Sequence, residues 1–179
     1  MVRTLGLMLL SALLSGGCDG RQAAAPPGAP APPPAAEARA AALEAAAPAL
    51  EKLDGHWQRG EEPSTFAAYF ERGQLRFLDE RVAPPRAAPR RNRYYFENGR
   101  LFYFAGEVPA AATVGGGADA RAALVPVSAE FSGQRALSAV RIEHYGPVPL
   151  TLPESAAILR QAGELASVAS SAHQALGSR

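Results

Sequence analysis

A short pattern of apolar and polar positions occurs twice in the middle of the chain. Tyr69–Phe77 and Tyr95–Tyr103 both follow Y-F-E-x-G-x-L-x-[FY], in which a polar turn separates two mainly apolar stretches. Such short apolar stretches around a turn are typical of paired β-strands, and Asn-Gly in the second copy is a strong hairpin turn because both residues accept positive φ. Each copy is therefore predicted to be a β-hairpin.

The turn at Asn98-Gly99 sets the strand register expected for the second hairpin. Arg72 accepts positive φ less readily than asparagine, so the first hairpin is expected to use a three-residue loop with Gly73 in a bulge. A third, degenerate copy of the pattern follows at Glu130–Gln134. The pairs expected in the second hairpin are Glu97 with Arg100, Phe96 with Leu101, Tyr95 with Phe102 and Tyr94 with Tyr103.

Two stretches have the features of helices. Thr151–Glu154 is a capping box with proline in the first turn, and it precedes an apolar stripe with helical spacing. This C-terminal helix is expected to lie across one face of a sheet rather than in a coiled coil. Ala36–Ala47 is rich in alanine and predicts a weaker N-terminal helix that Pro48 ends or kinks. The stripe consists of Ile158, Ala162, Leu165, Ala169, Ala172 and Leu176.

These elements together predict an α+β fold. The expected architecture is an antiparallel β-hairpin meander packed by the C-terminal helix, with the weaker N-terminal helix at an edge or on the other face. The expected domain, residues 36–179, has the usual size for a single core. Its strands are expected at Thr65–Phe70, Leu75–Leu78, Arg93–Glu97, Arg100–Phe104, Leu124–Phe131 and Ala136–Tyr145, with a short helical turn at Pro48–Leu53.

The N-terminal segment has the layout of an export signal. Within Met1–Gly17, Arg3 is followed by the apolar run Leu5–Leu14, which is too short to span a bilayer, and small residues precede Cys18. The pattern resembles the lipobox of bacterial lipoproteins, with Ser15 where that family prefers leucine. The resemblance implies that the signal peptide, residues 1–17, is removed and that Cys18 is acylated, for instance by palmitate. The protein is then anchored in the cell envelope, on the periplasmic side of the inner or the outer membrane; the alternative is an ordinary secretory leader followed by a free thiol.

Residues 18–35 separate the predicted anchor from the domain. Proline and alanine dominate this segment, which has no apolar period. Polyproline geometry rises about 3.1 Å per residue, so the segment can hold the domain up to about 50 Å from the membrane. The acylated cysteine and this linker therefore form a tether, and the alternative is a proline-rich ligand for a partner domain.

Charge and residue counts exclude several classes of function. The chain has 18 basic and 17 acidic residues, and loss of Arg3 with the leader makes the mature chain neutral, so no global field attracts nucleic acid. Cys18 is the single cysteine, so the domain is stabilised without disulfides. His56, His144 and His173 lie far apart and form no spaced metal pair. No metal, cofactor or nucleic acid is therefore expected.

The second hairpin has aromatic side chains on both of its faces. In the expected register Tyr95, Phe102 and Phe104 share one face, and the opposite face is equally apolar. An antiparallel sheet at a surface normally has one polar face, so both faces of this hairpin need cover. That cover comes either from the chain's own helical regions or from a ligand or partner that binds the aromatic surface.

A cluster of arginines precedes the second hairpin. Arg90, Arg91 and Arg93 belong to a basic stretch that follows Pro84-Pro85. Guanidinium groups bind phosphate and carboxylate bidentately, so the cluster can contact an anionic envelope polymer or an envelope protein. The alternative is a solvated loop, since Lys52 is the single lysine and arginine is the usual basic residue of this chain.

The function expected from these features is that of a lipid-anchored cell-envelope protein, a non-enzymatic binding or scaffolding module. The expected partners are the membrane, through the lipid, and an unidentified envelope protein or anionic polymer. One alternative is an inhibitor or sensor of a cell-wall hydrolase, with Arg90 and Arg91 as its contacts. Another is a hydrolase that uses His144 with Glu143, although no motif of defined geometry supports it.

Acylation of Cys18 is open to a direct test. We expect the protein to stay in the bacterial membrane fraction after a salt wash, and its intact mass to include fatty acid. The reason is that each buried CH₂ contributes about 0.8 kcal/mol, so two or three acyl chains hold a protein on a membrane almost permanently. Cys18→Ser should abolish acylation. A wild-type protein that is unmodified and washes freely from membranes would contradict the prediction.

Overall fold

The computed structural model describes residues 35–85, 87–109 and 123–178, all within one compact unit of the chain, Pro33–Arg179. Cys18, the signal peptide and the linker up to residue 34 lie outside the described residues, as do residues 110–122. No helix in the described part of the chain is long and apolar enough to cross a bilayer.

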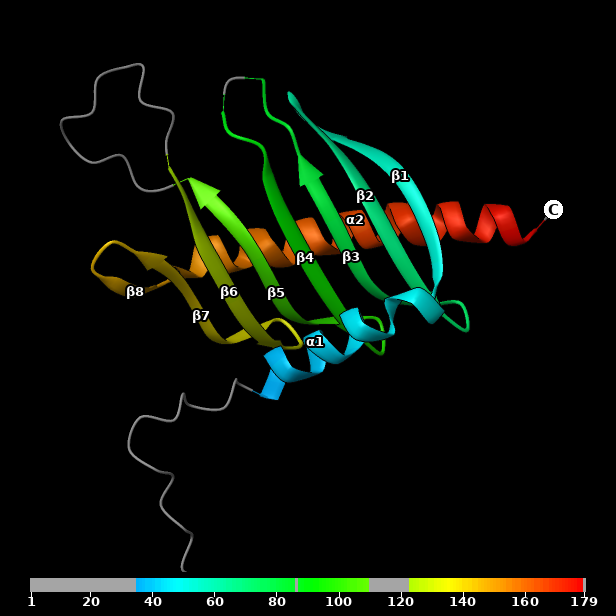
Figure 1. Ribbon diagram of the computed structural model, residues 1–179, viewed down its shortest axis with the longest axis horizontal. Coiled ribbons are helices and arrows are strands. Elements are labelled where there is room, and N and C mark those ends of the chain that lie inside the picture. Colours follow the sequence, from blue (N-terminus) through cyan, green and yellow to red (C-terminus); the bar gives the residue numbers. More distant parts are fainter. Residues whose placement is uncertain (1–34, 86, 110–122, 179) are drawn as a thin grey trace, which may run out of the picture. The chain divides into compact units, whose positions relative to one another are not determined.

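One antiparallel sheet of eight strands carries the fold (Figure 1). The strand order follows the chain, so each strand pairs with the strands that precede and follow it in sequence. This meander and its two helices confirm the predicted α+β class. The strands are β1 (Glu51–Arg59), β2 (Glu62–Glu71), β3 (Gln74–Val82), β4 (Arg90–Glu97), β5 (Arg100–Pro109), β6 (Leu124–Ser132), β7 (Arg135–Glu143) and β8 (Gly146–Pro149).

Each face of the sheet carries a helix. The C-terminal helix α2 (Leu152–Gly177) crosses the strands on one face, and the N-terminal helix α1 (Ala35–Ala46) lies on the other (Figure 1). A 3₁₀ turn (Ala47–Ala49) joins α1 to β1. The predicted capping box begins α2: the Thr151 hydroxyl accepts a hydrogen bond from the Glu154 amide, and the Glu154 carboxylate accepts one from the Thr151 amide at 2.7 Å.

The two copies of the repeated pattern form the hairpins β2–β3 and β4–β5 with the same turn. Asn98 and Gly99 have φ angles of 51° and 73°, and Arg72 and Gly73 have φ angles of 52° and 76°. Both turns therefore place two central residues in the left-handed region, as a type I′ turn requires. The three-residue loop expected for the first hairpin is wrong, because Arg72 itself adopts the positive φ.

A β-bulge close to the turn changes the register of β4–β5. Phe96 pairs with Leu101 as expected, but Tyr95 pairs with Tyr103 and not with Phe102. Phe102 is the extra residue of the bulge, which interrupts the alternation of faces along the strand. As a result Phe102 and Tyr103 both join the cluster beneath α1.

The same bulge occurs in all three hairpins of the repeated pattern. The register shifts between Tyr69 and Phe70 in β2–β3 and between Glu130 and Phe131 in β6–β7. The degenerate third copy is therefore a hairpin of the same kind. Bulges bend strands and raise their local twist, so the three together shape the sheet at the end where these turns lie.

Each face of the sheet has its own hydrophobic cluster. Beneath α2, aromatic side chains of the strands meet small residues of the helix and the fully buried Leu165. Every buried residue of the two clusters lies between Ala36 and Ala169. A shortened chain of residues 33–179 therefore keeps both clusters and is suitable for experiments on the domain. The α2 cluster consists of Phe66, Ala68, Phe70, Leu78, Tyr94, Phe96, Leu101, Phe104, Val127, Ala129, Phe131, Ala162, Leu165 and Ala169, and the α1 cluster of Ala36, Ala40, Phe77, Tyr95, Phe102 and Tyr103.

The first and last strands differ from the sequence prediction. Pro48–Leu53 was expected to form a helical turn, but β1 begins within it, and β8 is a further strand that was not predicted. Asp54-Gly55 has the composition of a turn, yet Gly55 lies inside β1 because the ring of Phe66 packs against it. A Cβ at this glycine would lie 2.3 Å from that ring, so the residue permits close packing and does not end the strand.

Contact between α2 and the sheet can be tested at one buried leucine. Leu165→Ala should lower the free energy of unfolding of residues 33–179 by about 3 kcal/mol, because a fully buried side chain leaves a cavity. Leu176→Ala is the matched control on the same helix, since this residue is 58% exposed, and it should cost less than about 0.5 kcal/mol. Urea unfolding measures both. Equal losses would contradict this packing of α2.

Candidate functional site

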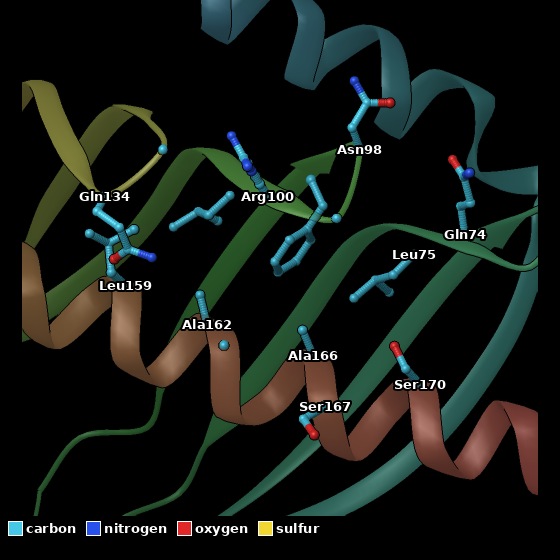
Figure 2. A pocket seen from close by; sticks show the side chains of 15 residues that line it. Gln74, Leu75, Asn98, Arg100, Gln134, Leu159, Ala162, Ala166, Ser167 and Ser170 are labelled. Atoms are coloured by element: carbon cyan, nitrogen blue, oxygen red, sulfur yellow. The ribbon is translucent and has the colours of Figure 1, made fainter.

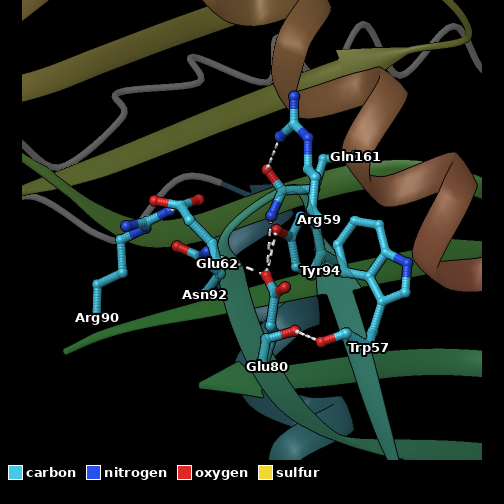
Figure 3. A network of polar contacts seen from close by, with 9 residues as sticks. Trp57, Arg59, Glu62, Glu80, Arg90, Asn92, Tyr94 and Gln161 are labelled. Atoms are coloured by element: carbon cyan, nitrogen blue, oxygen red, sulfur yellow. Dashed lines mark hydrogen bonds and ion pairs between the residues drawn. The ribbon is translucent and has the colours of Figure 1, made fainter. Parts of the chain in front are cut away.

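Polar side chains interrupt the apolar surface beneath α2. Glu80 of β3 and Asn92 of β4 face the helix with only 1% and 5% of their surface exposed. Tyr94 of β4 lies beside them, and Gln161 reaches toward them from α2 (Figure 3). We call these four residues the Glu80 network.

Three neutral donors converge on one oxygen of Glu80. The Tyr94 hydroxyl donates to Glu80 Oε2 at 2.8 Å, Asn92 Nδ2 at 3.1 Å and Gln161 Nε2 at 3.0 Å. Gln161 Oε1 in turn accepts a hydrogen bond from the Arg59 guanidinium at 3.1 Å. Glu80 takes part in none of the ion pairs found among the described residues, so its carboxylate is held by hydrogen bonds alone. The network therefore ties the middle of α2 to β3 and β4.

The burial of Tyr94 fixes its role in the network. Desolvation raises the pKa of its hydroxyl well above the ordinary value, and the charge and hydrogen bond of Glu80 raise it further. The hydroxyl therefore keeps its proton across the neutral range and acts as a donor to Glu80. Tyr94 also presents its ring to Phe104, with ring centroids 5.2 Å apart, so one face of the side chain packs while the tip is hydrogen-bonded.

A glycine on the neighbouring strand makes room for Asn92. Gly106 of β5 lies so close that a Cβ there would be 2.5 Å from Asn92 Oδ1 and 2.5 Å from the ring of Phe104. A larger residue at this position would push the amide away from Glu80. The backbone of β5 thus positions the network through close approach, which glycine alone permits.

A pocket of about 490 Å³ lies beside the Glu80 network, between the first turns of α2 and strands β4 to β7. We call it the α2 pocket. Asn92, Tyr94 and Gln161 contribute to its wall. Most of the remaining wall is apolar and includes Phe104, Val108, Val127, Leu150, Ala157 and Ile158.

Charged side chains line the rest of the α2 pocket. Arg90 pairs with Glu62 at 2.7 Å, and Arg141 pairs with Glu154 at 2.6 Å. Hydrogen bonds from Thr151 lower the pKa of Glu154, and Arg141 lowers it further, so this carboxylate stays ionised at neutral pH.

Glu107 is the fifth charged residue of the α2 pocket and differs from the other four. Its Oε2 accepts a hydrogen bond from the backbone amide of Arg91 at 3.2 Å, near the point where the pairing of β4 with β5 ends. Within the described part of the chain it belongs to no ion pair. The residue is half-buried and belongs to the lining of the α2 pocket, but its place in β5, between Gly106 and Val108 of the α2 face, directs its side chain to the opposite face, where it lines a depression with Arg91 and Arg93.

A second and larger cavity, of about 960 Å³, lies between α2 and the hairpin turns (Figure 2). Its helix wall is made of small residues such as Ala162 and Ala166, and its rim of exposed turn residues such as Gln74, Asn98 and Gln134. None of the buried polar side chains of the described residues lines it. Since fixed polar groups give a site its specificity, the α2 pocket is the better candidate despite its smaller volume.

The aromatic residues proposed as a partner surface lie in the interior. Tyr95 and Phe102 are 1% and 7% exposed beneath α1, and Phe104 is 3% exposed beneath α2. The Tyr95 hydroxyl donates to Glu44 of α1, and the Arg39 guanidinium lies 4.4 Å from the centre of the Phe102 ring. The chain's own helices therefore supply the cover that these side chains need, and in this structure they are not available to a partner.

The three arginines of the predicted cluster each have an internal carboxylate partner. Arg90 pairs with Glu62, Arg91 forms two hydrogen bonds to Asp79 at 2.6 and 2.7 Å, and Arg93 pairs with Glu44 at 2.6 Å. They do not form one surface, because Arg90 faces α2 while Arg93 contacts α1. Arg90 and Phe104 are the two predicted site residues that line the α2 pocket.

Sequence reasoning missed Glu80, Asn92 and Gln161, although a signal for Glu80 was present. Glu80 alternates with Leu78 and Val82 along β3, and the two apolar residues are buried on the α2 face. A charged residue at an inward position of a strand indicates a buried hydrogen-bonding site. Gln161 offers no such signal, since it follows the helix stripe at a position that also suits a solvent-exposed residue.

No metal site is evident among the described residues: they contain no group of three or more histidine, cysteine, aspartate or glutamate side chains placed to hold an ion. His173 stacks on Phe70 with ring centroids 4.0 Å apart, and His144 contacts Tyr145 edge to face. Both are thus engaged with aromatic rings. Glu143, the proposed catalytic partner of His144, instead pairs with Arg141.

The comparisons with known proteins give no family for this chain. No protein-family model matches it, and no curated protein or solved structure is significantly similar to it. Its function is therefore argued from the geometry of the site.

The contribution of the Glu80 network to the stability of the domain can be tested by substitution of Glu80. Glu80→Ala should lower the free energy of unfolding by about 3 kcal/mol, because three buried donors lose their acceptor. Glu80→Gln retains an oxygen and should cost less. The matched control is Glu164→Ala on the exposed side of α2, which should cost less than about 0.5 kcal/mol. If Glu80→Ala cost no more than Glu164→Ala in urea unfolding, the network would not hold α2 to the sheet.

Proposed function

We propose that this protein is a lipid-anchored binding protein of the cell envelope that holds a small, largely apolar ligand in the α2 pocket. The observation that carries the proposal is the pocket itself. Its volume of about 490 Å³ falls within the range of sites that enclose small molecules, roughly 300–1,000 Å³. Seven of its fifteen lining residues are apolar, and the other eight bring polar groups that can orient a ligand.

The wall of the pocket is held in place before any ligand binds. Tyr94, Asn92 and Gln161 are fixed by their shared contact with Glu80, and Gly106 keeps the β5 backbone against Asn92. Polar side chains that are already ordered lose little conformational entropy on binding. This arrangement supports a binding function, since rigid walls favour recognition of one shape.

The N-terminal sequence supports the same proposal. The lipobox-like sequence that ends at Cys18, followed by a proline-rich linker, suits a domain that works near a membrane surface without being buried in it. A small ligand replaces the envelope protein or anionic polymer expected from the sequence, because Arg90, Arg91 and Arg93 are paired with carboxylates of the chain.

The proposal is tested by closing the pocket. N-phenyl-1-naphthylamine, an uncharged apolar dye that fluoresces in apolar sites, is titrated into residues 33–179. Ala157→Trp should reduce dye affinity at least about tenfold, because Ala157 lines the pocket and an indole would fill it. Ala156→Trp is the matched control, since the neighbouring Ala156 is exposed. Absence of dye binding to the wild type, or equal loss in both variants, would contradict the proposal.

A further inference from the structure

A pocket of about 410 Å³ lies at the ends of β1, β2 and β3. We call it the Arg81 pocket. We infer that it binds a phosphate ester, whose phosphate group contacts the side chains of Arg81 and Thr65. This inference goes beyond the proposed function and does not depend on it, because the polar side chains of the Arg81 pocket and the α2 pocket belong to opposite faces of the sheet.

The register of the sheet brings the polar side chains of the Arg81 pocket together. Phe77 lies beneath α1 and Leu78 beneath α2, and since side chains alternate along a strand, Arg81 points to the α1 face. Thr65 is directly opposite Arg81 on β2, and His56 is directly opposite Thr65 on β1. All three side chains line the pocket and are exposed, so α1 does not cover this part of its face. Donors from three neighbouring strands are therefore open to a ligand.

The charges around the Arg81 pocket favour an anion. Arg81 belongs to none of the ion pairs found among the described residues, and no aspartate or glutamate is among the residues that line the pocket. On the other side of β3, Arg81 is directly opposite Arg91 of β4. Like charges that face each other across two strands destabilise the pair. An anion bound at Arg81 would offset this repulsion.

The acidic residues on this part of the α1 face do not supply the missing charge. Asp79 of β3 accepts two hydrogen bonds from Arg91, at 2.6 and 2.7 Å. Asp54 of β1 pairs with Lys52 at 2.9 Å. Glu107 lies on β5, two strands beyond β3 and thus about 10 Å away at the usual spacing of strands. The guanidinium of the pocket is therefore left for a ligand.

Donors that come from three strands suit a phosphate group better than a carboxylate. A guanidinium contacts two oxygens of either group side by side. A phosphate ester has a third free oxygen, which the Thr65 hydroxyl or a ring N–H of His56 can contact from the neighbouring strands. It also carries a charge of about −1.5 to −2 at pH 7, which strengthens its attraction to two guanidinium groups. Pro63, Ala83 and Pro89 form an apolar part of the lining, against which the organic part of the ester can lie.

The experiment titrates residues 33–179 with glycerol 3-phosphate at pH 7 and follows the backbone amide signals by NMR. The amides of Thr65 and Arg81 should shift, and glycerol and acetate should each bind at least about tenfold more weakly than the phosphate ester. Arg81→Gln should weaken binding about tenfold, and Thr65→Val about fivefold, because each removes a donor to a charged group. Arg160→Gln is the matched control. It removes the same charge from an exposed residue of α2 and should leave the affinity unchanged.

Vesicles distinguish the two sources of such a group. Phosphatidylcholine vesicles with and without phosphatidic acid are sedimented with the same chain. Binding that requires phosphatidic acid and is lost in Arg81→Gln would identify a lipid headgroup, whereas binding of glycerol 3-phosphate alone would identify a soluble ester, and either result supports the phosphate site.

Three results would overturn the inference. One is that neither glycerol 3-phosphate nor phosphatidic acid binds. Another is that acetate binds as tightly as glycerol 3-phosphate, which would remove the preference for phosphate. The third is an equal effect of Arg81→Gln and Arg160→Gln, which would show attraction by net charge alone. Should Arg81→Gln not fold, Thr65→Val decides in its place, since valine has the same shape without the hydroxyl, and an unchanged affinity of this variant overturns the contact.

Discussion

The constraint on which this structure depends is that the central strands are apolar on both faces. Tyr94 and Tyr95 are neighbours in β4, point to opposite faces and are each 1% exposed. A single sheet with two apolar faces cannot be stable in water, because each exposed face would lose the free energy of burying its aromatic side chains. The chain meets this constraint with one helix on each side, and the two differ: α2 crosses the sheet along most of its width, whereas the shorter α1 covers the central strands (Figure 1).

The residues of the helices explain how this cover is achieved and where it is incomplete. Alanine at Ala162 and Ala169 lets α2 lie close to the large side chains of β4 and β5, and Leu165 fills the space between them. In its first turns α2 contacts the sheet through polar side chains instead of apolar ones. Glu154 contacts Arg141, and Gln161 contacts Glu80. Polar contacts hold the helix without filling the space beneath it, and the α2 pocket lies there.

Local patterns predicted the elements well and their pairing less well. Turn chemistry at Asn98-Gly99 and capping chemistry at Thr151 act within a few residues, so the hairpins and the start of α2 were predictable. The bulge was not, since every residue of Leu101–Phe104 is apolar or aromatic and no alternation marks which residue is extra, and its consequence was a wrong assignment of faces. Gly55 and Gly106 show a further limit: each serves close packing with a side chain of a neighbouring strand, which no local pattern records.

The candidate site was harder to predict because it depends on distant residues. Gln161 meets Glu80 across a separation that only the folded meander closes, and the two arginines of the pocket come from β4 and β7. Sequence reasoning found Arg90 but assigned it to an external anion, whereas Glu62 supplies its partner within the chain. The general lesson lies in charge pairing: in a chain with nearly equal numbers of basic and acidic residues, a local cluster of one sign is weak support for a binding surface. A charged residue at an inward position of a strand, such as Glu80, is more informative, because its burial requires hydrogen-bond donors that the fold must bring together from distant parts of the chain.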